Sequence, residues 1–89
     1  MRRRFLVVGR VQGVGFRAWA VRRARALGLR GTVCNRADGS VDVEVAGETD
    51  AVQRFREVLA RGPEPAAVRA VREEPPTDSA LPDVFRIIG

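Results

Sequence analysis

The chain has 89 residues, of which 45% are hydrophobic and 30% are charged, a balance typical of one small soluble domain over residues 1–89. It contains no His, no Lys and one Cys, which excludes histidine-dependent catalytic systems, histidine or all-cysteine metal sites, lysine Schiff bases and an internal disulfide. The net charge of +5 is uneven, because residues 1–30 hold nine Arg and no acid whereas residues 31–89 hold seven Arg and eleven acids, so we expect an anionic partner.

The first expected element is a strand at Phe5–Val8, a continuous apolar run that ends at Gly9. Such a run is typical of a strand that is buried on both faces and is therefore central in its sheet. A loop follows at Arg10–Gly15. Together with Gly9 it holds three glycines in seven residues, which allows the backbone to approach another group closely.

A helix is expected to begin at Phe16. Apolar residues recur at spacings of four, four and three, which places them on one face of a helix; they are Phe16, Ala20, Ala24 and Leu27. Gly28 follows at the position where helices commonly end with a glycine.

Residues 31–46 are predicted to form a β-hairpin. Gly31–Asn35 is its first strand, and Asp38-Gly39 favours a tight turn. In the second strand, valines alternate with small or polar residues, so one face is expected in the core and the other in solvent. The core positions are Val41, Val43 and Val45, and the solvent positions are Ser40, Asp42, Glu44 and Ala46.

A second helix is expected after the hairpin. Thr49 is a plausible N-cap, since its hydroxyl could accept a hydrogen bond from the first helical turn. The apolar stripe consists of Val52, Phe55 and Leu59, with Val58 beside it. Gly62-Pro63 ends the helix.

Two further strands complete the predicted order. One covers Val68–Glu73, where the imperfect alternation allows a bulge, and a proline-rich loop follows at Glu74–Pro82. The last strand covers Val84–Ile88, with Phe85 and Ile87 on one face. The order β-α-β-β-α-β plus a short C-terminal strand predicts an α+β, ferredoxin-like split βαβ sandwich, in which two helices cover one face of an antiparallel sheet.

The segment Gly9–Arg17 has the composition of an anion site. Glycines allow successive backbone N–H groups to point at one ligand, and the helix that follows adds unpaired N–H groups and a positive dipole end. Arg17, in the first turn, could bind two phosphate oxygens. These parts would bind a small dianion without a metal. The segment is neither a P-loop nor a dinucleotide fingerprint, and it also fits a tight turn beside a solvated arginine.

Asn35 is the second candidate, because it ends a strand that should lie near the first one. Its neutral amide cannot act as a base, but it can hold a water molecule by accepting and donating hydrogen bonds. The alternative is that Asn35 opens the hairpin turn.

Gly9–Arg17 resembles the acylphosphatase signature at every position, and Leu27–Asn35 resembles the second signature of that family. Asp38–Val41 and Gly62-Pro63 also match, so the resemblance covers the whole chain. It implies the ferredoxin-like fold and the hydrolysis of acyl phosphates, with Arg17 binding the phosphate and Asn35 positioning water. The implied backbone phosphate cradle is Gln12, Gly13, Val14, Gly15 and Phe16, with no metal and no cofactor.

The absent histidine agrees with this chemistry. An acyl phosphate has a carboxylate leaving group of low pKa, so no general acid is needed, and phosphoryl transfer depends mainly on positioning and charge stabilisation. The expected partners are a small acyl phosphate and the phosphate ion. No uncharged run could span a bilayer and no signal segment opens the chain, so we expect a cytoplasmic monomer without membrane contact.

Two other hypotheses remain open at this point. A basic ferredoxin-like module could bind nucleic acid without catalysis, but this needs aromatic residues on the open sheet face, whereas the four phenylalanines fall on apolar stripes. A regulatory domain of a hydrogenase-maturation carbamoyltransferase would be expected to come with zinc-finger cysteines, which are absent. Cys34 lacks a His partner and is expected to face the sheet, and Trp19 is expected to pack on its helix.

Overall fold

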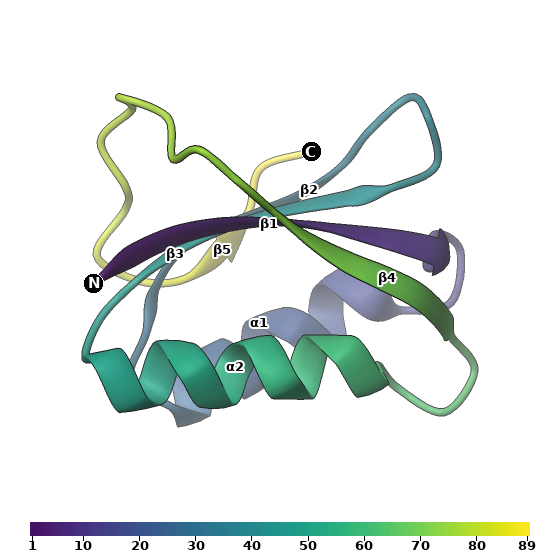
Figure 1. Ribbon diagram of the computed structural model, residues 1–89, viewed down its shortest axis with the longest axis horizontal. Helices are drawn as coiled ribbons and strands as arrows, with labels where there is room; N and C mark the ends of the chain where they lie inside the picture. The colour runs from purple at the N-terminus through teal and green to yellow at the C-terminus, as the bar shows by residue number, and fades with distance from the viewer.

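The computed structural model describes all 89 residues, Met1–Gly89, as one sheet covered by two helices (Figure 1). None of the helices is both long and apolar enough to span a membrane. In chain order the elements are β1 (Arg2–Arg10), α1 (Phe16–Ala26), β2 (Arg30–Asn35), β3 (Val41–Ala46), α2 (Thr49–Arg61), β4 (Ala67–Glu74) and β5 (Arg86–Ile87).

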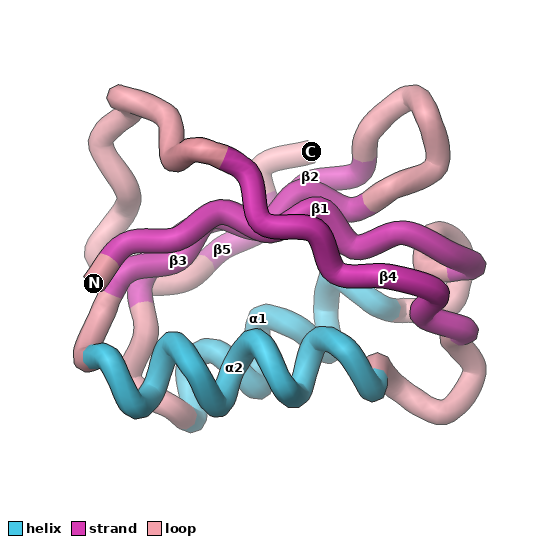
Figure 2. The backbone as a smooth tube through the Cα atoms, viewed as in Figure 1, coloured by secondary structure: helices cyan, strands magenta, loops and turns pink.

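The strands form a five-stranded sheet in the order β4-β1-β3-β2-β5, and both helices lie on the same side of it (Figure 2). The ferredoxin-like order is confirmed, and so is the interior position of β1. The sheet is mixed, because β5 pairs with β2 in parallel. The prediction of an antiparallel sheet is therefore wrong for that pair. β4 and β5 lie at opposite edges of the sheet and are joined by a long loop, not by a hairpin.

This topology brings three chain segments to one end of the sheet. Both β1 and β2 run antiparallel to β3, so they are parallel to each other and their carboxyl ends lie at the same end. β5 runs parallel to β2 and ends there as well. The loop after β1, the last residue of β2 and the residues after β5 therefore meet, although they are far apart in the sequence.

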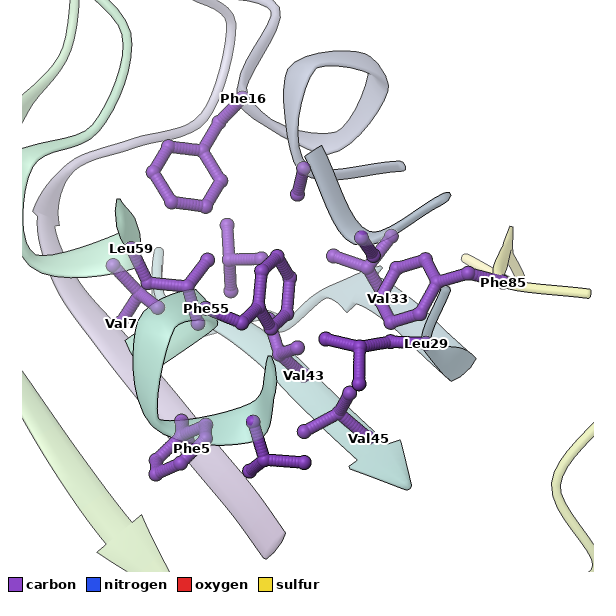
Figure 3. Close-up of a cluster of buried hydrophobic side chains, with 14 of the residues drawn as sticks. Phe5, Val7, Phe16, Leu29, Val33, Val43, Val45, Phe55, Leu59 and Phe85 are labelled. Carbon is purple, nitrogen blue, oxygen red and sulfur yellow. The ribbon is translucent and has the colours of Figure 1, made fainter. Parts of the chain in front are cut away.

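The core lies between the sheet and the helices (Figure 3). The predicted stripe of α2 is confirmed, since all four of its residues are buried, and so are Phe16, Ala20 and Ala24 of α1. Leu27, the fourth residue predicted for the first stripe, is the C-cap of α1 and is half-buried. The Phe85 ring is fully buried and contacts Phe55 edge to face, with 5.7 Å between ring centroids. Burying such a ring contributes about 1.5–3 kcal/mol, which fixes the chain just before β5.

The helix ends follow the predicted glycines but not the predicted cap. Gly28 and Gly62 adopt φ values of 69° and 68° after α1 and α2. Thr49 is the first residue of α2 and not its N-cap; Glu48 is the N-cap, in an extended conformation and without a side-chain hydrogen bond. The Thr49 prediction is wrong by one residue because no side-chain cap marks this end.

The face of the sheet opposite the helices is less exposed than predicted. Ser40, Glu44 and Ala46 are each about 5% exposed and not in solvent. The 75–85 loop crosses this face (Figure 1), and Glu44 accepts hydrogen bonds from the backbone N–H and the hydroxyl of Thr77 at 3.0 and 2.8 Å. The valine alternation predicts the core face correctly, but it does not show that a distant loop covers the other face.

Of the last two strands, β4 has the irregularity that was predicted, whereas β5 is shorter than predicted. The register of β1 with β4 shifts between Val8 and Gly9, which is the irregularity that the broken alternation allowed. β5 is only two residues long, where Val84–Ile88 was predicted. Phe85 is buried whereas Ile87 is 44% exposed, so the two do not share a buried face.

Candidate phosphate-binding site

A cavity of about 160 Å³ lies where the three segments meet, at the end of the sheet. Its lining includes Arg17, Asn35 and most of the cradle loop, which is residues 12–16. The two predicted site residues therefore come together although 18 positions separate them in the sequence. The residues that line it are Val11, Gln12, Gly13, Gly15, Phe16, Arg17, Ala18, Asn35 and Ile87. Val14 is the one predicted cradle residue outside this lining, because its side chain packs against the core.

The cradle loop presents backbone N–H groups that have no carbonyl acceptor. The first backbone hydrogen bond after the loop runs from Trp19 N–H to the Gly15 carbonyl, at 3.1 Å, and no residue of 12–16 donates a backbone bond outside the regular elements. Gly13 and Gly15 adopt left-handed φ values of 75° and 78°. Alternating loop conformations of this kind, followed directly by a helix N-terminus, form an anion-binding concavity.

Arg17 lies in the first turn of α1 and is half-buried. Its Nη1 donates to the backbone oxygen of Gly89 at 2.7 Å, and no carboxylate pairs with it. A guanidinium carries five N–H donors, so one bond leaves the others available to an anion. The structure therefore places beside the unpaired N–H groups a positive charge that no Asp or Glu side chain neutralises.

Asn35 is the last residue of β2 and pairs with Val41, so its side chain lies on the helix-covered face of the sheet. Its Oδ1 is buried and accepts no hydrogen bond. The turn that follows is closed instead by backbone bonds between Arg36 and Ser40, at 2.9 Å, and between Gly39 and Arg36, at 3.2 Å. A buried acceptor without a hydrogen-bond donor lowers the stability of the fold. We therefore expect Oδ1 to accept a hydrogen bond from a bound molecule.

Cys34 points to the opposite face from Asn35, since it pairs with Asp42 in the register. It lines a larger cavity of about 560 Å³, which lies between the 75–85 loop and the face of the sheet opposite the helices. Burial, helped by the nearby Asp42 carboxylate, raises the pKa of the Cys34 thiol. A neutral thiol on the wrong face does not act as the nucleophile of the phosphate site.

The cluster of positive charge at the start of the chain is largely neutralised within the fold. Arg2 pairs with Glu44 at 2.7 Å, Arg3 with Glu73 at 3.3 Å, and Arg4 with Asp42 at 2.9 Å. Hydrogen bonding to Asp42 also raises the pKa of Arg4. Three of the nine arginines that suggested an anionic partner therefore have an acidic partner within the fold.

Two contacts of the site are not predicted from the sequence. One is the Gly89 oxygen, which accepts from both Arg17 and the Asn35 N–H. The other is the Gln12 side chain, which was expected to contribute only its backbone N–H but donates to the carbonyls of Arg36 and Ser40 at 2.8 and 2.9 Å. The only available signal was a long amide side chain within a glycine-rich loop.

Comparison with known proteins agrees with this geometry. The family model for acylphosphatases matches residues 3–87. An acylphosphatase of Rhizobium etli is 45% identical over 86 residues, which are 97% of this chain and 92% of that relative. The crystal structure of acylphosphatase from Bacillus subtilis has a TM-score of 0.85 and 34% identity, covering 99% of this chain and 98% of that one. An acylphosphatase structure from Coxiella burnetii also has a TM-score of 0.85, with 35% identity and coverages of 98% and 90%. The chain belongs to the acylphosphatase family.

Proposed function

We propose that this chain hydrolyses the carboxyl–phosphate bond of a small acyl phosphate, releasing a carboxylate and inorganic phosphate without a metal. The observation that best supports this is one small cavity that contains unpaired backbone N–H groups, an arginine without an acidic partner and a buried amide oxygen without a donor. These are the parts that a phosphoryl transfer to water requires.

The phosphoryl group binds in the cradle. Its oxygens accept hydrogen bonds from the N–H groups of Gln12–Phe16 and from the free donors of the Arg17 guanidinium. Because the negative charge on these oxygens redistributes as the acyl–phosphate bond breaks, donors that are fixed in advance stabilise the transition state more than the bound substrate.

Asn35 holds the attacking water. Its Oδ1 accepts one hydrogen from the water, which directs the water oxygen toward phosphorus. A bond forms between this oxygen and phosphorus while the bond between phosphorus and the acyl oxygen breaks, and the electron pair leaves with the carboxylate. A phosphate oxygen of the substrate takes the proton of the water, so no protein base is used.

The proposal is tested by phosphate release from benzoyl phosphate in the presence of a chelator. We expect turnover by the native chain, and a loss of about 100- to 1,000-fold in kcat for Arg17→Ala and for Asn35→Ala, as for removal of a preorganised transition-state contact. Arg22→Ala is the matched control, because Arg22 is an exposed arginine of the same helix. No turnover by the native chain, or an Arg17→Ala variant with near-native kcat, would refute the proposal.

The nucleic-acid hypothesis gives a different result in solution. It expects salt-dependent retention on nucleic acid by a chain that shows no turnover of benzoyl phosphate. No contact described above favours it over the phosphate site.

A further inference from the structure

The side chain of Gln12 connects the two halves of the candidate site. Gln12 lies in the cradle loop after β1, and its Nε2 donates to the carbonyl of Arg36 at 2.8 Å and to the carbonyl of Ser40 at 2.9 Å. A side-chain amide nitrogen has two hydrogens, so these two bonds use its full donor capacity. Both acceptors belong to the turn that directly follows Asn35.

The turn on the other side of this connection is itself closed by hydrogen bonds. Arg36 N–H donates to the Ser40 carbonyl at 2.9 Å, the same oxygen that Gln12 contacts. The backbone N–H and hydroxyl of Ser40 both donate to Asp38 Oδ1, at 3.0 and 2.6 Å. Residues 36–40 therefore form one small rigid unit, to which Gln12 binds at both ends.

Apart from the β1–β3 ladder, whose last pair is Val7–Val41, little else holds this turn against the cradle. The side chains of residues 36–39 are exposed and do not pack in the core, and Ser40 is buried but polar. The salt bridge from Arg36 Nη1 to Asp42, at 3.1 Å, runs along the hairpin and not toward the cradle. The two bonds of Gln12 are thus the direct polar contacts between the cradle loop and the turn.

We propose that the Gln12 side chain is a positioning residue, which sets the distance between the phosphoryl group in the cradle and the water on Asn35. This inference rests on the proposed function. Gln12 contributes its backbone N–H to the cradle, and its side chain acts through the turn on Asn35. In-line attack is sensitive to such distances, since a displacement of about 1 Å can cost about 100-fold in rate.

The test replaces Gln12 with Met, which keeps the length of the side chain and its backbone N–H but has no donor for the two carbonyls. We expect kcat for benzoyl phosphate to fall by about 10- to 100-fold. KM and the inhibition constant of inorganic phosphate should stay within about threefold of native, since the cradle N–H groups and Arg17 remain. Gln12→Leu should behave in the same way, because it too is neutral and has no donor for the two carbonyls.

Arg25→Met is the matched control, since it removes a side-chain bond to a backbone carbonyl elsewhere, from Arg25 Nε to Phe85 at 3.0 Å. We expect this control to keep native kcat. Thermal unfolding with and without phosphate checks folding, because a ligand that binds the folded state raises its Tm. The phosphate-induced rise in Tm should persist in both Gln12 variants, and a missing rise in both would overturn the inference, because Gln12 would then be needed for the cradle itself.

A double-mutant cycle with Asn35→Ala shows whether Gln12 acts through Asn35. If it does, Gln12→Met costs less than about threefold in the Asn35→Ala background. An undiminished cost there, an unchanged kcat in Gln12→Met, or a loss confined to KM overturns the inference. These outcomes are distinct from failure of the proposed function, in which the native chain has no turnover or Asn35→Ala keeps native kcat.

Discussion

Arg17 and Gly89 are joined by a hydrogen bond of 2.7 Å from the Nη1 of the arginine to the backbone oxygen of the glycine. The backbone N–H of Asn35 donates to the same oxygen at 3.0 Å. One oxygen at the end of the described chain therefore contacts both candidate catalytic residues. It orders the guanidinium before substrate arrives and leaves most of its donors free.

Removal of Ile88 and Gly89 should weaken substrate binding. Without the Gly89 oxygen, Arg17 must be ordered by the substrate itself, which costs about 0.5–1.5 kcal/mol for a long side chain, or about two- to tenfold in KM for benzoyl phosphate. Ile88→Ala is the control, because it keeps the backbone of Gly89 while removing an exposed side chain. If Ile88→Ala raises KM as much as the deletion does, the Gly89 oxygen is not responsible.

Glu44 should stabilise the fold far more than Glu73 does. Its side chain is 7% exposed and binds Arg2 and Thr77, whereas the Arg3–Glu73 pair has side chains 42% and 51% exposed. Glu44→Ala removes a buried carboxylate together with its bonds to the partly buried Arg2 and to Thr77, and should lower the free energy of unfolding by about 1–3 kcal/mol. Glu73→Ala should cost less than about 0.5 kcal/mol, as exposed ion pairs do. Urea unfolding of the two variants measures both values, and equal losses would contradict the structure.

Gly9 should tolerate no side chain. It has a φ of 137°, and a Cβ there would clash with the carbonyl oxygen of Ala67 and lie 2.8 Å from the backbone nitrogen of Arg69. Gly9→Ala should therefore cost about 2–4 kcal/mol, from backbone strain and displacement of β4 together. Gly39→Ala is the comparison, since Gly39 has a φ of 92° but open space around it, and should cost about 1 kcal/mol. Similar midpoints of chemical unfolding for the two variants would contradict this difference.

The parts of the fold that were predicted correctly depend on local patterns. The stripe of Val52, Phe55 and Leu59 identifies α2, because a helix that packs on a sheet must repeat its apolar residues every three or four positions. The motif likewise placed Arg17 and Asn35 in one site. The errors concern contacts between distant segments. Glu44 is buried by a loop 33 residues away, which no alternation within β3 can reveal.

The contacts of Arg17 and Gln12 in the site were not predicted for the same reason. Arg17 bonds to a residue 72 positions later, and Gln12 bonds to residues 24 and 28 positions later. Such contacts depend on where the residues after β5 and the turn at 36–40 lie in the assembled sheet, and no local pattern predicts this. Charge counts mislead for a related reason, because Arg2 and Arg4 find their acidic partners on the neighbouring strand β3.

Cys34 should be unreactive and dispensable for turnover. Burial raises the pKa of its thiol above the ordinary 9.0, so the reactive thiolate is scarce near neutral pH. The rate of alkylation by iodoacetamide should still be rising at pH 9, and a plateau below pH 8 would contradict this environment. Cys34→Ala should keep kcat within about twofold, because the side chain lies on the face opposite the phosphate site.

Acid should loosen the turn after Asn35 through Asp38. Hydrogen bonds from the hydroxyl and backbone N–H of Ser40 lower the pKa of the Asp38 carboxyl below its ordinary 3.8. A group whose pKa is lower in the folded state stabilises that state above the unfolded pKa, and the stabilisation is lost as the pH falls through the folded pKa. The contribution of Asp38 should therefore be complete above about pH 5 and should disappear at more acidic pH. Thermal unfolding of the native chain and of Asp38→Asn measures this, because their difference in Tm should be constant from about pH 5 to 7 and shrink below about pH 4. A difference in Tm that does not change with pH would show that the Asp38 charge plays no part in holding the turn.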